Sequence, residues 1–377
     1  MNNTTRSVQN SGKRPRPVLM IPLRRCGSHA LRLRLNLNPE FYAPYPLHIV
    51  DFMPQVPRYG DLHDDAAYFQ MIVDVVGLET VSMVKWPDIV FDPIEIFESI
   101  KHEPRSVHRV VWELLLRSGS KRGAKVVMDK SLDSVHYAEE LMALFPDLLF
   151  LNVVRDPRAQ VSSMNKAIIH DFDVLLNAQT WVKAYEKAAD LSRKYPDRVL
   201  TIRFEDFVSN QEAVLRTVCK FFGIEFFTEM LDVAHSREAK QISTMSQLWE
   251  SNEFPPIPAN VDKFKKNLSV DEITVIETLT GDIMDRFGYQ RMTAGNADVS
   301  LLAVAAARER SAAKKLKAWD ELEQRDRRDY QLRRYRVDYL DMISRRNQKE
   351  VASIAGSHLN QVDKIRFQRE LLESAVA

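Results

Sequence analysis

The sequence predicts an α/β fold in which a central parallel sheet is flanked by helices and followed by a long α-helical C-terminal extension. Short β-branched runs alternate with stretches of helical periodicity as far as Tyr289, which is the pattern of βαβ units around a sheet buried on both faces. All 17 prolines lie at or before Pro258, and Gly356 is the only glycine after Ala297. The C-terminal part therefore lacks helix breakers and indicates long helix.

These patterns divide the chain into three parts. Residues 1–16 are polar and basic without apolar periodicity, and we expect a flexible leader there. Residues 17–292 are expected to form the α/β domain, and residues 297–377 the helical extension.

Individual elements follow from breakers and periodicity. The sequence predicts strands at Val18–Ile21, Lys125–Met128, Leu148–Val154 and Val199–Ile202. It predicts helices at Ser134–Leu144, Val174–Tyr195, Gln211–Phe222 and Asp271–Phe287. The last helix is preceded by Ser269 and contains Glu272, which together form a capping-box pattern.

Composition excludes several classes of protein. The formal charge is +1 and 45% of the 377 residues are hydrophobic, which argues against a disordered chain and a general nucleic-acid binder. Two cysteines cannot build a disulfide framework for this length. No run of about 18 apolar residues is present, and the N-terminus lacks an apolar signal core. We therefore expect a soluble, cytoplasmic protein.

The first strand leads into a loop suited to an anion. The loop Pro22-Leu-Arg-Arg-Cys-Gly-Ser-His is followed by an apolar stretch with helical spacing. A strand, a tight glycine turn and a helix start together present backbone N–H groups to a negative charge. The loop lacks the Gly-Lys-Ser/Thr ending of a nucleoside triphosphate loop.

The third strand ends at a second candidate site. Arg155 follows the strand, Pro157 begins a new helix, and Ser163 lies eight residues after Arg155. Ligands of open α/β sheets bind at such carboxyl ends, and eight residues are about two helical turns. Taken alone, this segment favours a helix start capped by Asp156, with Arg155 in a surface ion pair.

With these stretches considered together, the chain resembles the bacterial-type sulfotransferases that use 3′-phosphoadenosine 5′-phosphosulfate (PAPS), a family with a P-loop-like fold. The resemblance covers roughly residues 16–289 and makes the α/β domain the catalytic domain. It implies PAPS as co-substrate, its desulfated nucleotide as product, and no metal. The nucleotide-binding residues that it implies are Arg25, Cys26, Gly27, Ser28, His29, Arg155, Ser163, Phe204, Lys263, Lys265 and Lys266.

Two departures from the family pattern concern the chemistry. His29 replaces a hydroxyl residue, and Leu132 stands where the family has a basic histidine. Arg25 and Lys130 remain to stabilise the leaving oxygen of an in-line transfer. A carboxylate or imidazole must then serve as general base, for which the candidates are Glu40, His48 and Asp133.

The sequence identifies neither the acceptor nor the role of the extension. The expected acceptor is a hydroxyl or amine of a carbohydrate or another small metabolite, with a mild preference for a sugar. A nucleotide kinase or hydrolase, or a non-catalytic assembly protein, are the alternative functions. An apolar stripe in residues 305–346 indicates packing on the domain or self-association, although the spacing through residues 324–329 is too irregular for a strict coiled coil.

Overall fold

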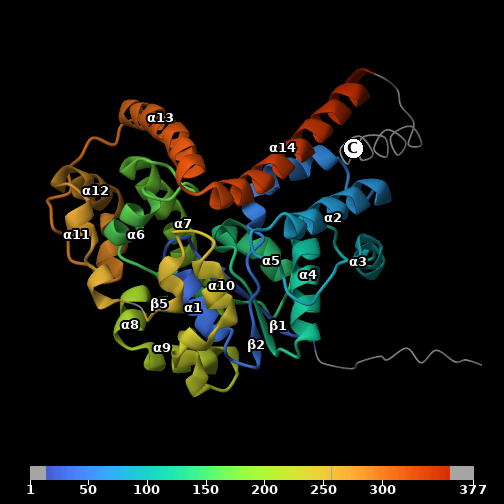
Figure 1. The fold of residues 1–377 in the computed structure, drawn as a ribbon, viewed down its shortest axis with the longest axis horizontal. Helices are drawn as coiled ribbons and strands as arrows, with labels where there is room; N and C mark the ends of the chain where they lie inside the picture. The colour runs from blue at the N-terminus through green and yellow to red at the C-terminus, as the bar shows by residue number, and fades with distance from the viewer. Residues whose placement is uncertain (1–13, 256, 357–377) are drawn as a thin grey trace, which may run out of the picture.

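The computed structural model describes residues 14–255 and 257–356 and contains a five-stranded, wholly parallel sheet (Figure 1). The strand order is β2-β3-β1-β4-β5. The strands are β1 (Arg16–Ile21), β2 (Phe41–Tyr42), β3 (Val126–Asp129), β4 (Leu149–Val154) and β5 (Val199–Arg203). Four of them confirm the predicted strands to within two residues at each end. The edge strand β2 was not predicted, because two residues carry no periodicity.

Helices cover both faces of the sheet. Their bounds are α1 (Ser28–Leu35), α2 (Asp65–Thr80), α3 (Pro93–Ile100), α4 (Val107–Lys121), α5 (Ala138–Leu144), α6 (Pro157–Met164), α7 (Val174–Lys194), α8 (Phe204–Ser209), α9 (Gln211–Phe222), α10 (Arg237–Ser243), α11 (Phe264–Asn267), α12 (Val270–Arg286), α13 (Leu301–Arg325) and α14 (Arg327–Gly356). The predicted helices at α7, α9 and α12 are confirmed, including the Ser269–Glu272 capping box.

Alternate residues of each strand enter two separate cores, as the two-residue period of a strand requires. Leu19 and Ile21 of β1 pack with α2, α4 and α7 on one face. Val18 and Met20 pack with α1 and α9 on the other face. Burial on both sides explains why the strands are continuous apolar runs.

The order of the strands creates a switch point at the centre of the sheet. β1 pairs with β3 on one side and with β4 on the other, so the chain leaves the carboxyl ends of β1 and β4 in opposite directions. Crevices at such points are where open α/β sheets bind ligands.

Three details differ from expectation. The segment predicted as one helix over residues 134–144 starts as a 3₁₀ helix, Leu132–Tyr137, and continues as α5. The sequence analysis did not identify the long helices α2 and α4. Arg16, expected in the leader, is the first residue of β1, whereas residues 1–13 lie outside the described residues.

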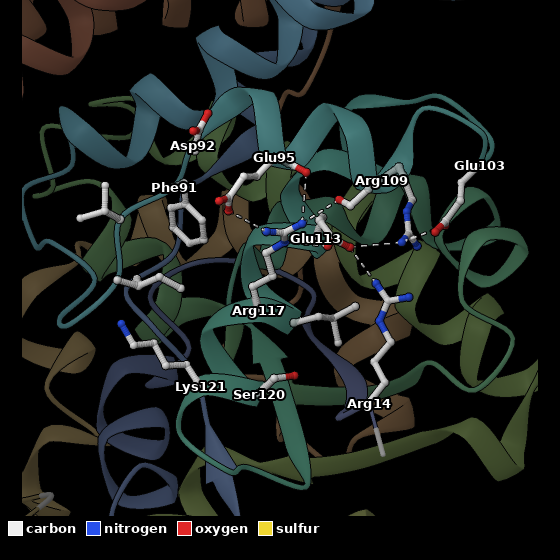
Figure 2. A pocket seen from close by; sticks show the side chains of 14 residues that line it. Arg14, Phe91, Asp92, Glu95, Glu103, Arg109, Glu113, Arg117, Ser120 and Lys121 are labelled. Carbon is white, nitrogen blue, oxygen red and sulfur yellow. Dashed lines mark hydrogen bonds and ion pairs between the residues drawn. The ribbon is translucent and has the colours of Figure 1, made fainter. Parts of the chain in front are cut away.

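An ion-pair network joins Arg14 to α3 and α4 (Figure 2). Glu113, nearly buried, accepts hydrogen bonds from Arg14 at 3.0 Å, Arg117 at 2.8 Å and Arg109 at 3.3 Å. Arg109 also pairs with Glu103 at 2.8 Å. Because Arg14 precedes β1, this network lies at the amino end of the sheet. Its arginine and glutamate side chains pair with one another.

The extension forms two helices that pack on the α/β part of the molecule. The helices α13 and α14 meet at Asp326, within the segment whose apolar spacing is irregular. Val304 and Ala307 of α13 join Leu175 and Leu176 of α7 in a small apolar cluster. This cluster lies at the start of α13, and the packing or self-association expected of the stripe in residues 305–346 stays a prediction.

A buried ion pair docks α14 on α2. Arg346 donates to both carboxylate oxygens of Asp74, and Tyr59 also bonds that carboxylate. The hydroxyl of Tyr339 donates to the Asp74 carbonyl oxygen at 3.1 Å. A Cβ added at Gly77 would lie 1.9 Å from that hydroxyl oxygen, so this helix pair needs glycine to approach so closely.

None of the helices in the described ranges combines the length and the apolar composition needed to cross a bilayer.

We expect Arg346→Met to lower the free energy of unfolding by about 3–5 kcal/mol, because it leaves the buried Asp74 carboxylate without its cation. The adjacent Arg345→Met is the matched control. The side chain of Arg345 is 74% exposed and pairs with an exposed carboxylate, Asp341, and such pairs contribute roughly 0–1 kcal/mol. Urea denaturation of both variants measures the difference, and equal midpoints would contradict the structural role of the pair.

Candidate functional site

The loop after β1 has two residues in the left-handed region of the backbone. Arg25 and Gly27 have positive φ angles of 72° and 90°, a region that L-residues other than glycine rarely occupy. The Gly27 Cα lies against the ring of Phe204, where an added Cβ would be 2.2 Å from two ring carbons. The loop ends at the N-terminus of α1, whose first N–H groups have no intrahelical acceptor.

Two arginines from different strands meet at the switch point. The Nε of Arg25 donates to the Ser163 hydroxyl at 3.0 Å. A guanidinium N–H of Arg155 donates to the carbonyl oxygen of Arg25 at 2.7 Å. Arg155 also lies over the Phe204 ring, with 4.7 Å to its centroid. The structure therefore brings together the loop, the α6 serine and the residue after β5.

The carboxyl end of β3 adds a lysine to the same place. The Nζ of Lys130 lies 3.0 Å from Nε2 of His29, while Nδ1 of His29 is buried without a hydrogen-bond partner in the described structure. Burial lowers the pKa of Lys130 to about 7, and nearby Arg32 adds to that shift. Burial and the Lys130 charge hold the pKa of His29 well below its usual range, so the imidazole is neutral at pH 7.

The arginines of the site lack the carboxylates that partner other buried arginines. Burial and the neighbouring Arg155 lower the pKa of Arg25 to about 10. Within the described residues, Arg25, Lys130 and Arg155 contact a hydroxyl, an imidazole and a carbonyl but form no ion pair. By contrast, Arg32 pairs with Glu238 at 2.6 Å and Arg158 pairs with Glu277 at 2.7 Å. These three cations come from three loops, and without a carboxylate at ion-pair distance they favour an anionic ligand.

A buried glutamine holds the loop in place. The side-chain amide of Gln160, on α6, donates to the Arg24 carbonyl at 2.8 Å. Its oxygen accepts hydrogen bonds from Trp181 at 3.0 Å and Tyr185 at 2.7 Å. Because Gln160 is fully buried and bonds both the loop and two side chains of α7, it fixes the loop against α6 and α7.

A cavity of about 460 Å³ lies at these residues. Arg25, Gly27, Ser28, His29, Arg155, Ser163, Phe204 and Lys263 line it, as the resemblance implied. It is also lined by Gln247, Trp249 and Asn252, and by Lys166, Asn260 and Asn267, which were not identified from the sequence. The volume and the polar lining are those of a site for a ligand of nucleotide size.

Three residues implied by the resemblance do not line this cavity. The Cys26 side chain packs in the core with Val18 and Met20, and burial raises the pKa of its thiol to about 11. Lys265 is exposed and pairs with Asp262 at 2.9 Å. Lys266 is likewise exposed. Cys26 therefore contributes only its backbone to the side of the loop that faces the cavity.

The candidate bases lie in different places. Glu40 bonds Lys125 and accepts from the N–H of Glu225 at 2.9 Å, at the amino end of the sheet. The Lys125 hydrogen bond lowers the pKa of Glu40. Asp133 is held by Arg24 at 2.6 Å and lines neither cavity of this region. The structure leaves Glu40 outside the cluster, whereas the charge of Asp133 acts on Lys130 and counters the lowering of its pKa.

His48 lies on a second cavity, of about 440 Å³, which shares Arg25, Ser28, His29 and Trp249 with the first. Burial and the charge of Arg24 hold the pKa of His48 well below its usual range. A neutral imidazole can accept a proton. Of the three predicted bases, His48 alone lines a cavity that also contains Lys130.

No cluster of three or more His, Cys, Asp or Glu side chains with the arrangement of a metal site occurs in the described ranges.

Comparisons with known proteins agree with the motifs. A model of the sulfotransferase family matches residues 17–229. The omega-hydroxy-beta-dihydromenaquinone-9 sulfotransferases of Mycobacterium bovis and Mycobacterium tuberculosis are each 26% identical over 279 residues. The match covers 68% of this chain and 66% of each relative, which is just under two thirds of their length.

Two solved domains share lower similarity. The sulfotransferase domain from the Synechococcus PCC 7002 olefin synthase is 20% identical with a TM-score of 0.48, covering 71% of this chain and 96% of that one. The sulfotransferase domain from the curacin biosynthetic pathway is 18% identical with a TM-score of 0.48, covering 74% and 99%.

We expect Gly27→Ala to weaken binding of the desulfated nucleotide at least about tenfold, because the methyl group must displace Phe204 and with it the stacked Arg155. Gly123→Ala is the matched control: Gly123 also has a positive φ, of 70°, but an added Cβ there contacts nothing. Isothermal titration calorimetry measures both affinities. Unchanged affinity in Gly27→Ala would contradict the close packing of the loop on Phe204.

Proposed function

This chain belongs to the sulfotransferase family, and we propose that it transfers the sulfuryl group of PAPS to a hydroxyl or amine of a small acceptor. The single observation that carries the proposal is the meeting of Arg25, Lys130 and Arg155, without carboxylate partners, beside the N-terminus of α1. A nucleotide with phosphate groups at both ends of its ribose supplies the missing negative charge.

The residues present fit this nucleotide. The Nε of Arg155 and Nδ1 of His29 are buried without hydrogen-bond partners in the described residues, and each can donate to a phosphate oxygen. Arg155 and Ser163 would hold the 3′-phosphate, while Arg25, Ser28 and His29 would hold the 5′ side. When bound, PAPS supplies the sulfuryl group: a sulfur–oxygen bond to the acceptor forms as the bond to the 5′-phosphate oxygen breaks.

The chain's own residues then have distinct tasks. Arg25 and Lys130 stabilise the negative charge that grows on the phosphate oxygen as it leaves. Lys130 donates to Nε2 of His29, which leaves Nδ1 of that ring as a donor rather than a base. We assign the base to His48, which alone of the three candidates lines the cavity with Lys130 and can accept the proton of the acceptor hydroxyl at an imidazole nitrogen. Glu40 is not assigned this role because it pairs with Lys125 at the amino end of the sheet, and Asp133 is not because Arg24 holds it at 2.6 Å.

A thermal scan with added nucleotides, together with a transfer assay, distinguishes this function from a kinase or hydrolase and from a non-catalytic protein. The desulfated nucleotide should raise the melting temperature, and Arg155→Ala should abolish the rise because the 3′-phosphate loses its cation. Stabilisation by ATP with magnesium but not by the desulfated nucleotide would instead identify a kinase or hydrolase. Binding without transfer to any acceptor hydroxyl or amine would identify a non-catalytic protein.

Affinity for the desulfated nucleotide should depend on pH through Lys130. Its pKa of about 7 in the free protein rises when an anion binds, so binding takes up a proton above pH 7. Affinity should therefore fall as pH rises above 7, by up to about tenfold per pH unit. Titrations between pH 7 and 9 test this trend.

The control variants separate Lys130 from general charge effects. Lys130→Met should bind more weakly at pH 7 and lose the fall above it. Lys125→Met removes an exposed lysine at the opposite end of the sheet and should keep the wild-type profile. The same slope in Lys130→Met as in the wild type would rule out Lys130 as its source.

A further inference from the structure

The second cavity is lined in part by the C-terminal extension. Its other lining residues come from the β1 loop, the end of β3 and the segments that follow β2, α2, α6 and α10. The extension contributes Lys315 and Trp319 from α13, and Leu332, Arg333, Arg334, Arg336, Val337 and Leu340 from α14. Residues at the carboxyl end of the sheet and residues more than 150 positions later therefore enclose one space.

The lining of this cavity combines charged side chains with a large apolar set. The aromatic and aliphatic members are Tyr45, Met83, Ile168, Ile169, Leu248, Trp249, Trp319, Leu332, Val337 and Leu340. Asp51 is the only carboxylate, and no asparagine, glutamine or glutamate occurs among the lining residues that the structure describes. The surface that this cavity exposes is more apolar than polar, which favours an acceptor with an apolar body.

Most cations of the lining already have partners. Arg333 pairs with Asp329 at 2.8 Å, Arg336 with Asp51 at 3.2 Å, and Arg24 with Asp133 at 2.6 Å. Arg334 pairs with Asp338 at 2.5 Å. Lys130 and Arg25 lie beside the nucleotide cavity and are accounted for by the nucleotide. Apart from the half-buried Lys315, the cavity therefore does not require a second anionic group.

We propose that α13 and α14 form one wall of the acceptor site, and that the acceptor is a neutral, largely apolar alcohol or phenol. This inference rests on the proposed function, and it narrows the acceptor from any hydroxyl compound to one with an apolar body. The hydroxyl end lies where the two cavities share Ser28 and His29, close to His48 and Lys130. The apolar body lies against Trp319, Leu332 and Leu340.

The wall is a fixed part of the molecule. The Asp74–Arg346 pair and the close contact of Tyr339 with Gly77 hold α14 on α2. Ser246 accepts from Arg333 at 3.0 Å and donates to Asp329 at 2.8 Å. These contacts fix α14 beside the segment that carries Leu248 and Trp249, so the site exists before the acceptor binds.

The test measures formation of the desulfated nucleotide from PAPS with three acceptors: 2-naphthol, 1-octanol and glucose. The full chain should use 2-naphthol or 1-octanol with a kcat/KM at least about a hundredfold above that for glucose. Trp319→Ala should lower kcat/KM for the preferred apolar acceptor by about tenfold or more, mainly through KM. Its affinity for the desulfated nucleotide should stay within twofold.

Matched variants keep the test informative if Trp319→Ala folds poorly. Val337→Asp introduces a charge into the cavity lining at a position that is already 41% exposed, and it should lower kcat/KM for the apolar acceptor. Leu316→Ala on α13 and Tyr335→Asp on α14 change exposed residues outside the lining and should have no effect.

The outcomes distinguish this inference from the function on which it rests. Preferred use of glucose, or unchanged kinetics in both cavity variants, overturns the apolar acceptor and leaves the sulfotransferase function standing. No product with any acceptor, together with no binding of the desulfated nucleotide, overturns the proposed function itself. Transfer to the apolar acceptors with the expected losses supports both.

Discussion

The structure depends on a concentration of positive charge that the protein itself does not neutralise. Arg25, Lys130 and Arg155 converge from β1, β3 and β4, and their partners are a hydroxyl, an imidazole and a carbonyl. Buried like charges oppose folding unless rigid neighbours hold them. The framework provides that rigidity: Gln160 fixes the loop, and Phe204 supports the Arg155 guanidinium. The arginines that only support the fold, Arg32 and Arg158, have their own carboxylates.

The cationic residues that follow β1, β3 and β4 could be predicted from the sequence because their signals are local. Each cationic residue follows a strand, and strand ends are marked by glycine or proline. Gln160 could not be identified in this way, because a polar residue on a short helix is typical of a solvated face. The apolar helix α2 was missed for the opposite reason: Tyr68, Met71 and Val75 belong to a helix buried on several sides, so no polar face reveals its period.

The candidate bases show how sheet topology decides where a residue lies. Glu40 was a candidate because the resemblance implied a glutamate just after the first helix. In a βα unit, however, the helix returns the chain to the amino end of the sheet, and a residue just after the helix lies a full strand length from the ligand end. Glu40 is there, paired with Lys125. His48 comes after β2, which carries the chain back to the carboxyl end. Predicting its place required β2, a strand of two residues that leaves no pattern.

The docking of α14 on α2 separates two properties that enzymes often combine in one segment. The first cavity is lined by residues between Arg25 and Asn267, whereas one wall of the second cavity comes from a later pair of helices anchored by Asp74 and Arg346. An anchor so far from the reacting groups makes the extension exchangeable in principle: a helical hairpin that keeps this ion pair but carries other side chains would recast the cavity without altering the donor loop. Exchange of the extension at its junction with the α/β part would therefore change the lining of the second cavity and leave the first cavity as it is.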